Sequence, residues 1–322
     1  MLSQVLSVLD QLDSPTVDGD AVAATLRALV PADGPGPLPT VEVERVHGAR
    51  GHTDFVTVRV PGTRGRTVGG DAPTLGIIGR LGGIGARPEL IGYVSDGDGA
   101  TAALAAATKL VTMHARGDRL TGDVIVATHV CAWAPTRPHE PVPFMDSPVD
   151  LGVMNDHEVH PEMDAIVSID TTKGNRIINH RGIAISPTVR QGYLLPVSPD
   201  LVALLESVSG EPAQVFALST QDITPYGNDL HHLNSILQPA VATSSPVVGV
   251  AITTVTAVAG CATGASHEVD IALAARYAVE VAKGYGSGTV RFHDEDELAA
   301  LQARYGSAAH LQTLGRAPGA AV

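Results

Sequence analysis

Two apolar stretches decide the fold: Asp123-Val-Ile-Val-Ala-Thr-His129-Val-Cys131-Ala-Trp133 and Met163-Asp-Ala-Ile-Val-Ser-Ile-Asp170-Thr-Thr-Lys173-Gly-Asn175. Each is short, rich in β-branched residues and bounded by residues that break regular structure, which is typical of a strand buried on both faces. Each also has polar side chains at its carboxyl end, where open α/β sheets bind their ligands. We therefore expect the functional site at this edge of a sheet.

Strand-like and helix-like segments alternate along the rest of the chain. We expect strands at residues 41–46, 54–60, 74–79, 183–186, 215–218 and 247–255, and helices at residues 100–116, 199–208, 229–237 and 271–282. This order predicts a single α/β domain over residues 1–322, a three-layer sandwich with a mostly parallel sheet and helices on both faces. Residues 41–282 form its core, residues 1–40 a helical N-terminal extension, and residues 283–322 a helical tail.

Composition excludes several classes of partner. The net charge of −13 argues against nucleic acid and anionic membrane surfaces, which both require basic patches. No apolar run approaches the roughly 20 residues that span a bilayer. The two cysteines, Cys131 and Cys261, make no disulfide framework and suit a reducing compartment. We expect a cytoplasmic protein; assembly into a homo-oligomer stays open.

Four motifs resemble those of the zinc-dependent exopeptidase fold, in particular the glutamyl aminopeptidase and cellulase-M group. They are Gly97-Asp98-Gly99-Ala100, Ile169-Asp170-Thr171-Thr172, Ser219-Thr220-Gln221-Asp222 and Ser266-His267-Glu268. The resemblance covers roughly residues 41–282. It implies that Asp98, Asp170 and His267 occupy positions of metal ligands.

Two positions depart from that resemblance. Arg80-Leu81-Gly82 stands where the family has a metal-binding His-x-Asp, and Cys131-Ala132 stands where it has Glu-Glu. One ligand, the general-base Glu and its neighbouring ligand are therefore missing. Over its whole length the chain is more similar to an uncharacterised bacterial and archaeal family, the domain of unknown function numbered eleven-seventy-seven. That resemblance, which rests on residues 167–174 and 311–315, brings no established activity.

Zinc or another divalent metal is the cofactor that these residues favour. Asp98, Asp170 and His267 supply carboxylate and imidazole ligands from separate strand ends, as zinc and manganese sites do. Further ligands are expected from the long loop 135–161, where His157 and His160 are the candidates. The alternative is that Asp98 only caps a helix and that Asp170 binds neighbouring backbone N–H groups.

Other side chains suit different chemistry. Cys131 is a candidate nucleophile activated by His129 or His267, although a single Cys at a strand end also serves as a small buried hydrophobe. Arg80 is a candidate for binding a substrate carboxylate, or alternatively a member of an ion pair. Lys173 either faces the site or lies on a solvated turn. Thr171 and Asp222 complete the predicted substrate-binding residues.

Three functions follow from these alternatives. The first is a metal-assisted hydrolase of a small peptide or amide bond, in which a polarised water attacks and Arg80 or Lys173 binds a carboxylate. The second is a non-catalytic protein that binds a small molecule or short peptide. The third is a cysteine-dependent enzyme that uses Cys131.

Overall fold

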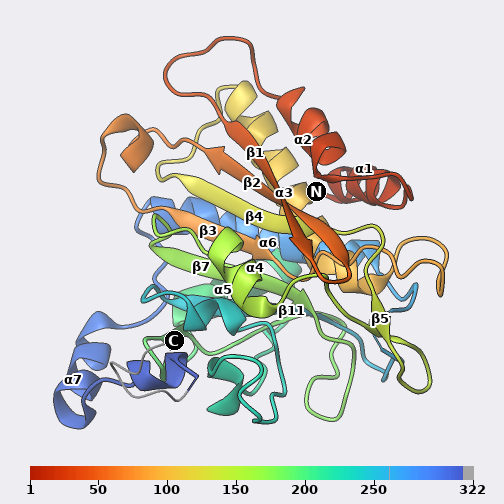
Figure 1. Cartoon of the computed structure of the whole chain (residues 1–322). Helices are drawn as coiled ribbons and strands as arrows, with labels where there is room; N and C mark the ends of the chain where they lie inside the picture. The colour runs from red at the N-terminus through yellow and green to blue at the C-terminus, as the bar shows by residue number, and fades with distance from the viewer. Residues whose placement is uncertain (261, 315–322) are drawn as a thin grey trace.

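The structure, a computed structural model, describes residues 1–260 and 262–314. Its centre is a nine-stranded sheet in the order β1-β2-β4-β3-β7-β11-β9-β10, with β8 also paired to β11 (Figure 1). The strands are β1 Thr40–Gly48, β2 Gly51–Val60, β3 Leu75–Gly79, β4 Val124–Val130, β7 Ala165–Thr171, β8 Gly182–Ile185, β9 Val189–Arg190, β10 Tyr193–Leu194 and β11 Val247–Thr253. A separate small hairpin pairs β5 Thr136–Arg137 with β6 Phe144–Met145.

The four central strands of the sheet run parallel. β3 pairs with β4 and β7, and β11 pairs with β7, all in parallel register, whereas the outer strands are antiparallel. The carboxyl ends of β3, β4, β7 and β11 therefore share one edge, as the sequence predicts. Hydrogen bonds tie that edge together, from Arg80 N to Ile169 O at 2.7 Å and from Thr171 Oγ1 to Ser95 O at 2.7 Å.

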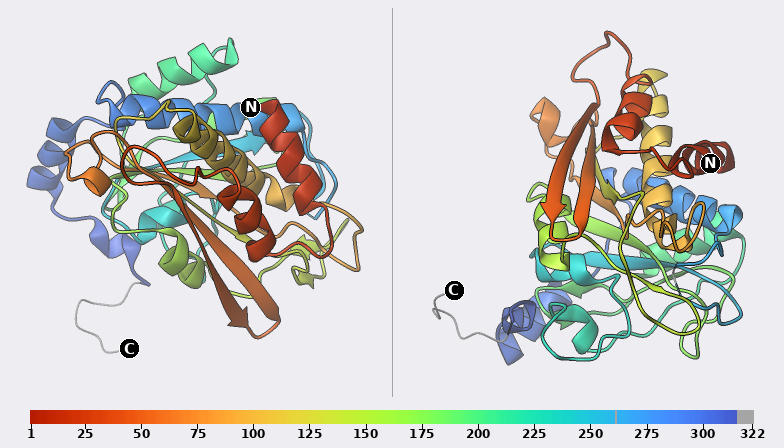
Figure 2. Two further views of the ribbon diagram at one scale, coloured as in Figure 1. Left: turned by 90° about the horizontal axis from the view of Figure 1, so that it is seen from above. Right: turned by 45° about the vertical axis from the view of Figure 1, so that its right-hand side comes forward.

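Long helices cover one face of the sheet (Figure 2). The helices are α1 Leu2–Leu12, α2 Gly19–Arg27, α3 Asp98–Ala115, α4 Leu151–Glu158, α5 Pro199–Ser209, α6 Glu268–Gly286 and α7 Glu295–Tyr305. Of these, α1, α2, α3, α5 and α6 share one apolar core with the sheet, which includes Val5 and Leu26 of the N-terminal extension. Close packing needs glycine at the start of α3, because a Cβ on Gly99 would lie 1.9 Å from the carbonyl oxygen of Arg80.

The other face of the sheet is covered mainly by short elements. Ile78, Ile125 and Ala251 point to this side and pack against Ile236 and Leu237 of a long irregular segment. The helical cover here consists of α4 and of 3-10 turns such as η3 Gln221–Ile223 and η4 Gln238–Val241. The remaining 3-10 turns are η1 Arg66–Val68, η2 Ser95–Gly97 and η5 Ala309–Gln312. The prediction of helices on both faces is thus confirmed only in part. The long helices lie on one face, and the other face has α4 and short 3-10 turns.

Two predicted elements are wrong. Residues 215–218 form no regular strand but only an isolated bridge, between Val215 and Ile185. Residues 229–237 form no helix, because a side chain competes for the backbone groups that a helix would use: the Asp222 carboxylate accepts from the N–H groups of Leu233 at 2.6 Å and Asn234 at 2.9 Å. Among the described residues, no helix combines the length and the apolar character needed to cross a bilayer.

Candidate functional site

A pocket of about 750 Å³ opens at the shared carboxyl edge of the parallel strands. Its floor comes from residues that follow or end β3 and β4, its walls from the segment 134–155 and from the irregular loop 225–241. The lining includes Leu81, Asp96, His129, Cys131, Met145, Met154, Asn155, Tyr226, Ser235, Gln238 and Leu314. This is the edge at which the sequence predicts the site.

A buried ion pair stands behind the pocket. Glu158, the last residue of α4, lies 2.5 Å from Arg80 Nε and 2.6 Å from His129 Nδ1, and all three side chains are at most 2% exposed. Arg80 Nη2 also donates to Asn155 Oδ1 at 2.7 Å. Burial pushes the pKa of Glu158 up, but Arg80 and His129 outweigh it and hold that pKa below its ordinary value. The network fastens α4 to the ends of β3 and β4.

This network changes the roles expected of Arg80 and His129. His129 Nε2 accepts a hydrogen bond from Gly82 N at 2.9 Å, so that Nδ1 carries the proton donated to Glu158. Both ring nitrogens are therefore engaged by the protein, which leaves His129 without a lone pair to activate Cys131. Arg80, expected to bind a substrate carboxylate, instead pairs with the carboxylate of Glu158.

Cys131 lacks the surroundings of a nucleophile. Burial raises the pKa of its thiol to about 11, and the sulfur lies 3.4 Å from the carbonyl oxygen of His52. A thiol with so high a pKa is almost entirely protonated at neutral pH. The geometry fits a small buried hydrophobe, the alternative that the sequence left open. Cys261 lies outside the described residues.

Asp98 does not fit the predicted metal site. The carboxylate is fully buried and accepts from Ser266 Oγ at 2.5 Å, while Lys173 Nζ stands 3.5 Å from its second oxygen. Lys173 also donates to the carbonyl of Ala265 at 2.5 Å. Burial raises the pKa of Asp98 to about 7, against the opposing pull of Lys173 and Ser266. An ammonium group thus occupies the position beside Asp98 where a cation would bind.

The remaining predicted ligands lie apart. His157 stacks on Phe55 with ring centres 4.5 Å apart and its Nδ1 lies 3.1 Å from Glu44, and His160 contacts Thr57, so both face the hairpin of β1 and β2. His267 immediately precedes α6, and it is the neighbouring Ser266 that bonds Asp98. Over the described part of the chain, no group of three or more His, Cys, Asp and Glu side chains could hold a metal ion. The residues predicted as ligands do not fit a metal.

Among the predicted ligands, Asp170 has the carboxyl group whose ionised form a nearby cation would stabilise most. It ends β7, accepts from Thr171 N at 2.7 Å and Ser235 Oγ at 3.2 Å, and is 5% exposed. Burial, reinforced by the negative charge of Asp96, raises the pKa of Asp170 to about 8. Asp96 and Ser235 line the pocket, and Asp170 lies beside it, in contact with the hydroxyl group of Ser235.

Two predicted substrate-binding residues have other contacts. Asp222 is fully buried and accepts from Ser219 N and Oγ as well as from the two backbone groups of the loop 225–241. It holds that loop in place rather than facing a ligand. Thr171 uses its hydroxyl to bond the carbonyl of Ser95.

The loop 135–161 does reach the strand ends, but through residues other than those expected. Its contributions are Asn155 and Glu158, not His157 and His160. Asp96, Ser235 and Tyr226 were also missed. The signal available for Glu158 was its place inside Asp156-His157-Glu158-Val159-His160, between two histidines of the kind that bind metals. For Asp96 it was the Asp-x-Asp spacing with Asp98.

Comparisons with known proteins place this site in context. The chain matches the family described as Protein of unknown function (DUF1177) over residues 44–315. It belongs to this family. No curated protein matches it. Among solved structures it is similar to the crystal structure of a cytosol aminopeptidase from Coxiella burnetii, at 13% identity and a TM-score of 0.51. The match covers 90% of this chain and 69% of the aminopeptidase, and at this identity the likeness shows the fold alone.

Proposed function

We propose that this member of the DUF1177 family binds a small molecule with a protonated amino group, such as a short peptide or an amino-acid derivative, in the pocket at the strand ends. The observation that carries the proposal is the buried carboxyl group of Asp170, which contacts the lining residue Ser235 and lies near Asp96 of the same lining. Asp170 retains its proton up to about pH 8 because Asp96 and burial disfavour a second negative charge there. A bound cation would remove that penalty.

Two more acids of the lining also have contacts within the protein. Asp146 is paired with Arg137 at 2.7 Å and with Arg50, and Asp150 caps α4 by accepting from Val153 N. Met145, Met154 and Leu81 line the pocket with apolar surface that suits the apolar part of a ligand.

Calorimetric titration tests the proposal. Leucylglycine and N-acetyl-leucylglycine differ in whether the nitrogen is charged, so only the first should bind. Binding should release protons when measured below pH 8, since the ligand drives Asp170 to ionise. Asp96→Asn and Asp170→Asn should each weaken binding at least about tenfold, the loss of one charge-assisted contact. Asp71→Asn, an exposed acid paired with Arg64, is the matched control. Equal binding of the acetylated peptide would refute the proposal.

A second candidate function is hydrolysis of a peptide or amide bond. It is favoured by the carboxyl group of Asp170, which keeps its proton to about pH 8 near the carboxylate of Asp96, an arrangement suited to general acid and base catalysis, and by the aminopeptidase-like fold. Asp96 would take a proton from the attacking water, whose oxygen bonds to the carbonyl carbon. Asp170 would give its proton to the nitrogen as the C–N bond breaks. Release of leucine from leucylglycine by the wild type, but not by Asp170→Asn, would establish it.

A further inference from the structure

The C-terminal residues 293–314, here called the arm, run from the far end of the sheet to the pocket. Leu314 lines the pocket, and Leu311 packs against the apolar cluster beneath the loop 225–241. Gln312 Nε2 fixes this end by donating to the carbonyl oxygens of Ala240 at 2.6 Å and Thr243 at 2.9 Å. The end of the arm is thus part of one pocket wall.

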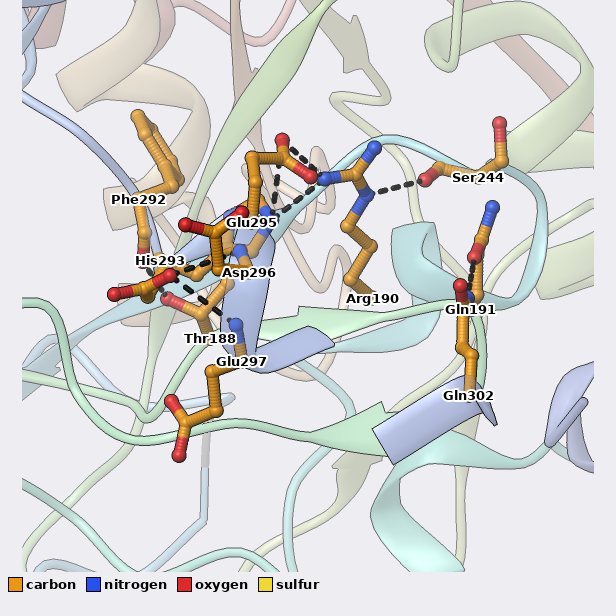
Figure 3. A network of polar contacts seen from close by, with 11 residues as sticks. Thr188, Arg190, Gln191, Ser244, Phe292, His293, Glu295, Asp296, Glu297 and Gln302 are labelled. Carbon is orange, nitrogen blue, oxygen red and sulfur yellow. Dashed lines mark hydrogen bonds and ion pairs between the residues drawn. The ribbon is translucent and has the colours of Figure 1, made fainter. Parts of the chain in front are cut away.

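The hairpin of β9 and β10 holds the arm at three successive places. Arg190 contacts the start of α7, Gln191 Oε1 accepts from Gln302 Nε2 at 2.5 Å, and Tyr193 Oη donates to the carbonyl of Gly306 at 2.5 Å. Figure 3 shows the first two of these contacts, with Arg190 between Ser244 and the start of α7.

Polar contacts dominate this attachment. Within α7, Leu298 is the buried residue, and its other described side chains are exposed or partly exposed. Elements with few buried apolar contacts open at the lowest free-energy cost. Opening of the arm is therefore expected to cost less free energy than unfolding of the core.

His293 lies at the start of the arm in an arrangement that favours its neutral form. The side chain is 5% exposed, and Nε2 lies 2.6 Å from Arg190 Nη1. Because a guanidinium only donates, Nε2 must accept, and Nδ1, which then carries the proton, has no hydrogen-bond partner in the described part of the chain. A proton on Nε2 would set an N–H against the N–H of Arg190.

The charges around His293 come from three elements. Arg190 belongs to β9, and Tyr285 of α6 lies close enough to Arg190 and Glu295 for both to influence its hydroxyl. Glu295 Oε1, on the arm itself, is 3.3 Å from His293 Nε2 and 2.5 Å from Arg190 Nη1, and Asp294 is adjacent. Burial lowers the pKa of His293; Glu295 opposes this and Arg190 adds to it. A protonated His293 would compete with Arg190 for the carboxylate of Glu295, and its positive charge would lie beside the guanidinium of Arg190.

We propose that the arm is a detachable wall of the pocket and that protonation of His293 releases it. Release would open the pocket where Leu314 now bounds it, and so admit longer ligands in mild acid. The effect of arm release on ligand binding rests on the proposed function, whereas the release itself can be measured without a ligand.

Hydrogen exchange of the full chain tests the arm directly. A histidine whose pKa is lowered by folding destabilises the docked state as pH falls below its free value of about 6.5. After correction for the intrinsic exchange rate, protection of peptides within residues 295–314 should fall up to about tenfold between about pH 7.5 and about pH 5.5, with that of β7 and β11 unchanged. Unchanged protection of the arm would overturn the proposal.

Two variants identify the titrating group. His293→Gln keeps a hydrogen-bonding side chain that cannot gain a proton, so its arm should show no pH-dependent loss of protection. His310→Asn removes an exposed histidine of the arm and should behave as the wild type. If His293→Gln fails to fold, Glu295→Gln serves instead: it removes the carboxylate that stabilises protonated His293 in the docked arm, so the pH-dependent loss of protection should become larger, with its onset still near the free pKa of about 6.5. A loss of protection in Glu295→Gln that is no larger than in the wild type, or a pH-dependent loss in His293→Gln, would contradict the role of His293.

Discussion

At the scale of single residues, the polar groups behind the pocket are held by one another. Arg80 follows β3, His129 belongs to β4 and Glu158 ends α4, and the buried carboxylate of Glu158 lies within ion-pair distance of both other side chains. Such a pair is weak as a source of net stability, yet its disruption is costly because it leaves a charge buried alone.

Glu158→Gln should therefore destabilise the fold strongly. Removing the carboxylate leaves the Arg80 guanidinium buried without a counter-charge, which should cost about 3–5 kcal/mol in the free energy of unfolding. Chemical denaturation at pH 7 measures it. Glu162→Gln is the matched control: Glu162 pairs with Arg59 on the surface at 3.3 Å, and its loss should cost less than about 1 kcal/mol. Similar losses in both variants would show that the buried pair has no special weight.

The pH dependence of stability should reveal Asp170. Folding raises its pKa to about 8, so between about pH 4 and about pH 8 the folded state holds a proton that the unfolded state has lost, and stability falls as pH rises. In Asp170→Asn this contribution is absent. The variant should gain up to about 1.4 kcal/mol per pH unit relative to the wild type across that window. If the free energies of unfolding of the two proteins changed with pH in the same way, the carboxyl group of Asp170 would be exposed to water and its pKa would not be raised by folding.

At the scale of elements, the close approach of α3 to the end of β3 positions the acidic end of the pocket. Asp96 and Asp98 lie at the start of α3, and the helix reaches the sheet because Gly79 and Gly99 leave room at the contact. A Cβ on Gly79 would lie 2.5 Å from the carbonyl oxygen of Gly99, which is closer than real packing allows.

Gly99→Ala should consequently destabilise the protein by about 2–3 kcal/mol, as overpacking does in other cores. Thermal unfolding gives the loss. Gly264→Ala is the control, because a Cβ at that position meets nothing within 4 Å and its backbone is not in the left-handed region. If Gly99→Ala has the melting temperature of the wild type, the start of α3 can accommodate a Cβ and the predicted overpacking is wrong.

At the scale of the whole molecule, the chain keeps the α/β architecture of an aminopeptidase-like fold while its own side chains supply the cation. Lys173, one of the few lysines in a chain of net charge −13, stands 3.5 Å from Asp98. Burying that carboxylate without a positive partner would be expensive.

We therefore expect protein purified without chelator to carry less than about a tenth of an equivalent of any transition metal. Elemental analysis decides this. Lys173→Met should lower stability because it leaves the buried carboxylate of Asp98 without a positive partner. Dialysis against zinc should leave the melting temperature of the wild type unchanged. A stoichiometric metal in the purified protein would restore the metal-assisted hydrolase that the sequence favours.

The sequence by itself determined the α/β class, the parallel centre of the sheet and the edge at which polar groups gather. Buried strands such as residues 124–130 and 165–171 can be predicted from their local apolar runs. Neighbouring parallel strands then have their carboxyl ends at the same edge of the sheet. Asp170 could be assigned to the site for that reason. The sequence could not show that residues 229–237 form no helix, since this depends on the Asp222 carboxylate, which accepts hydrogen bonds from their backbone.

Only the tertiary structure decided which side chains face one another. That Glu158 rather than His157 turns inward, that Arg80 meets Glu158 and not a ligand, and that Lys173 reaches Asp98 all depend on contacts between residues 75 or more positions apart. Charges are set in the same way, because the pKa of Asp170 follows from burial and from Asp96 on another element. Sequence spacing records neither direction nor burial, and these two properties determine the chemistry of a site.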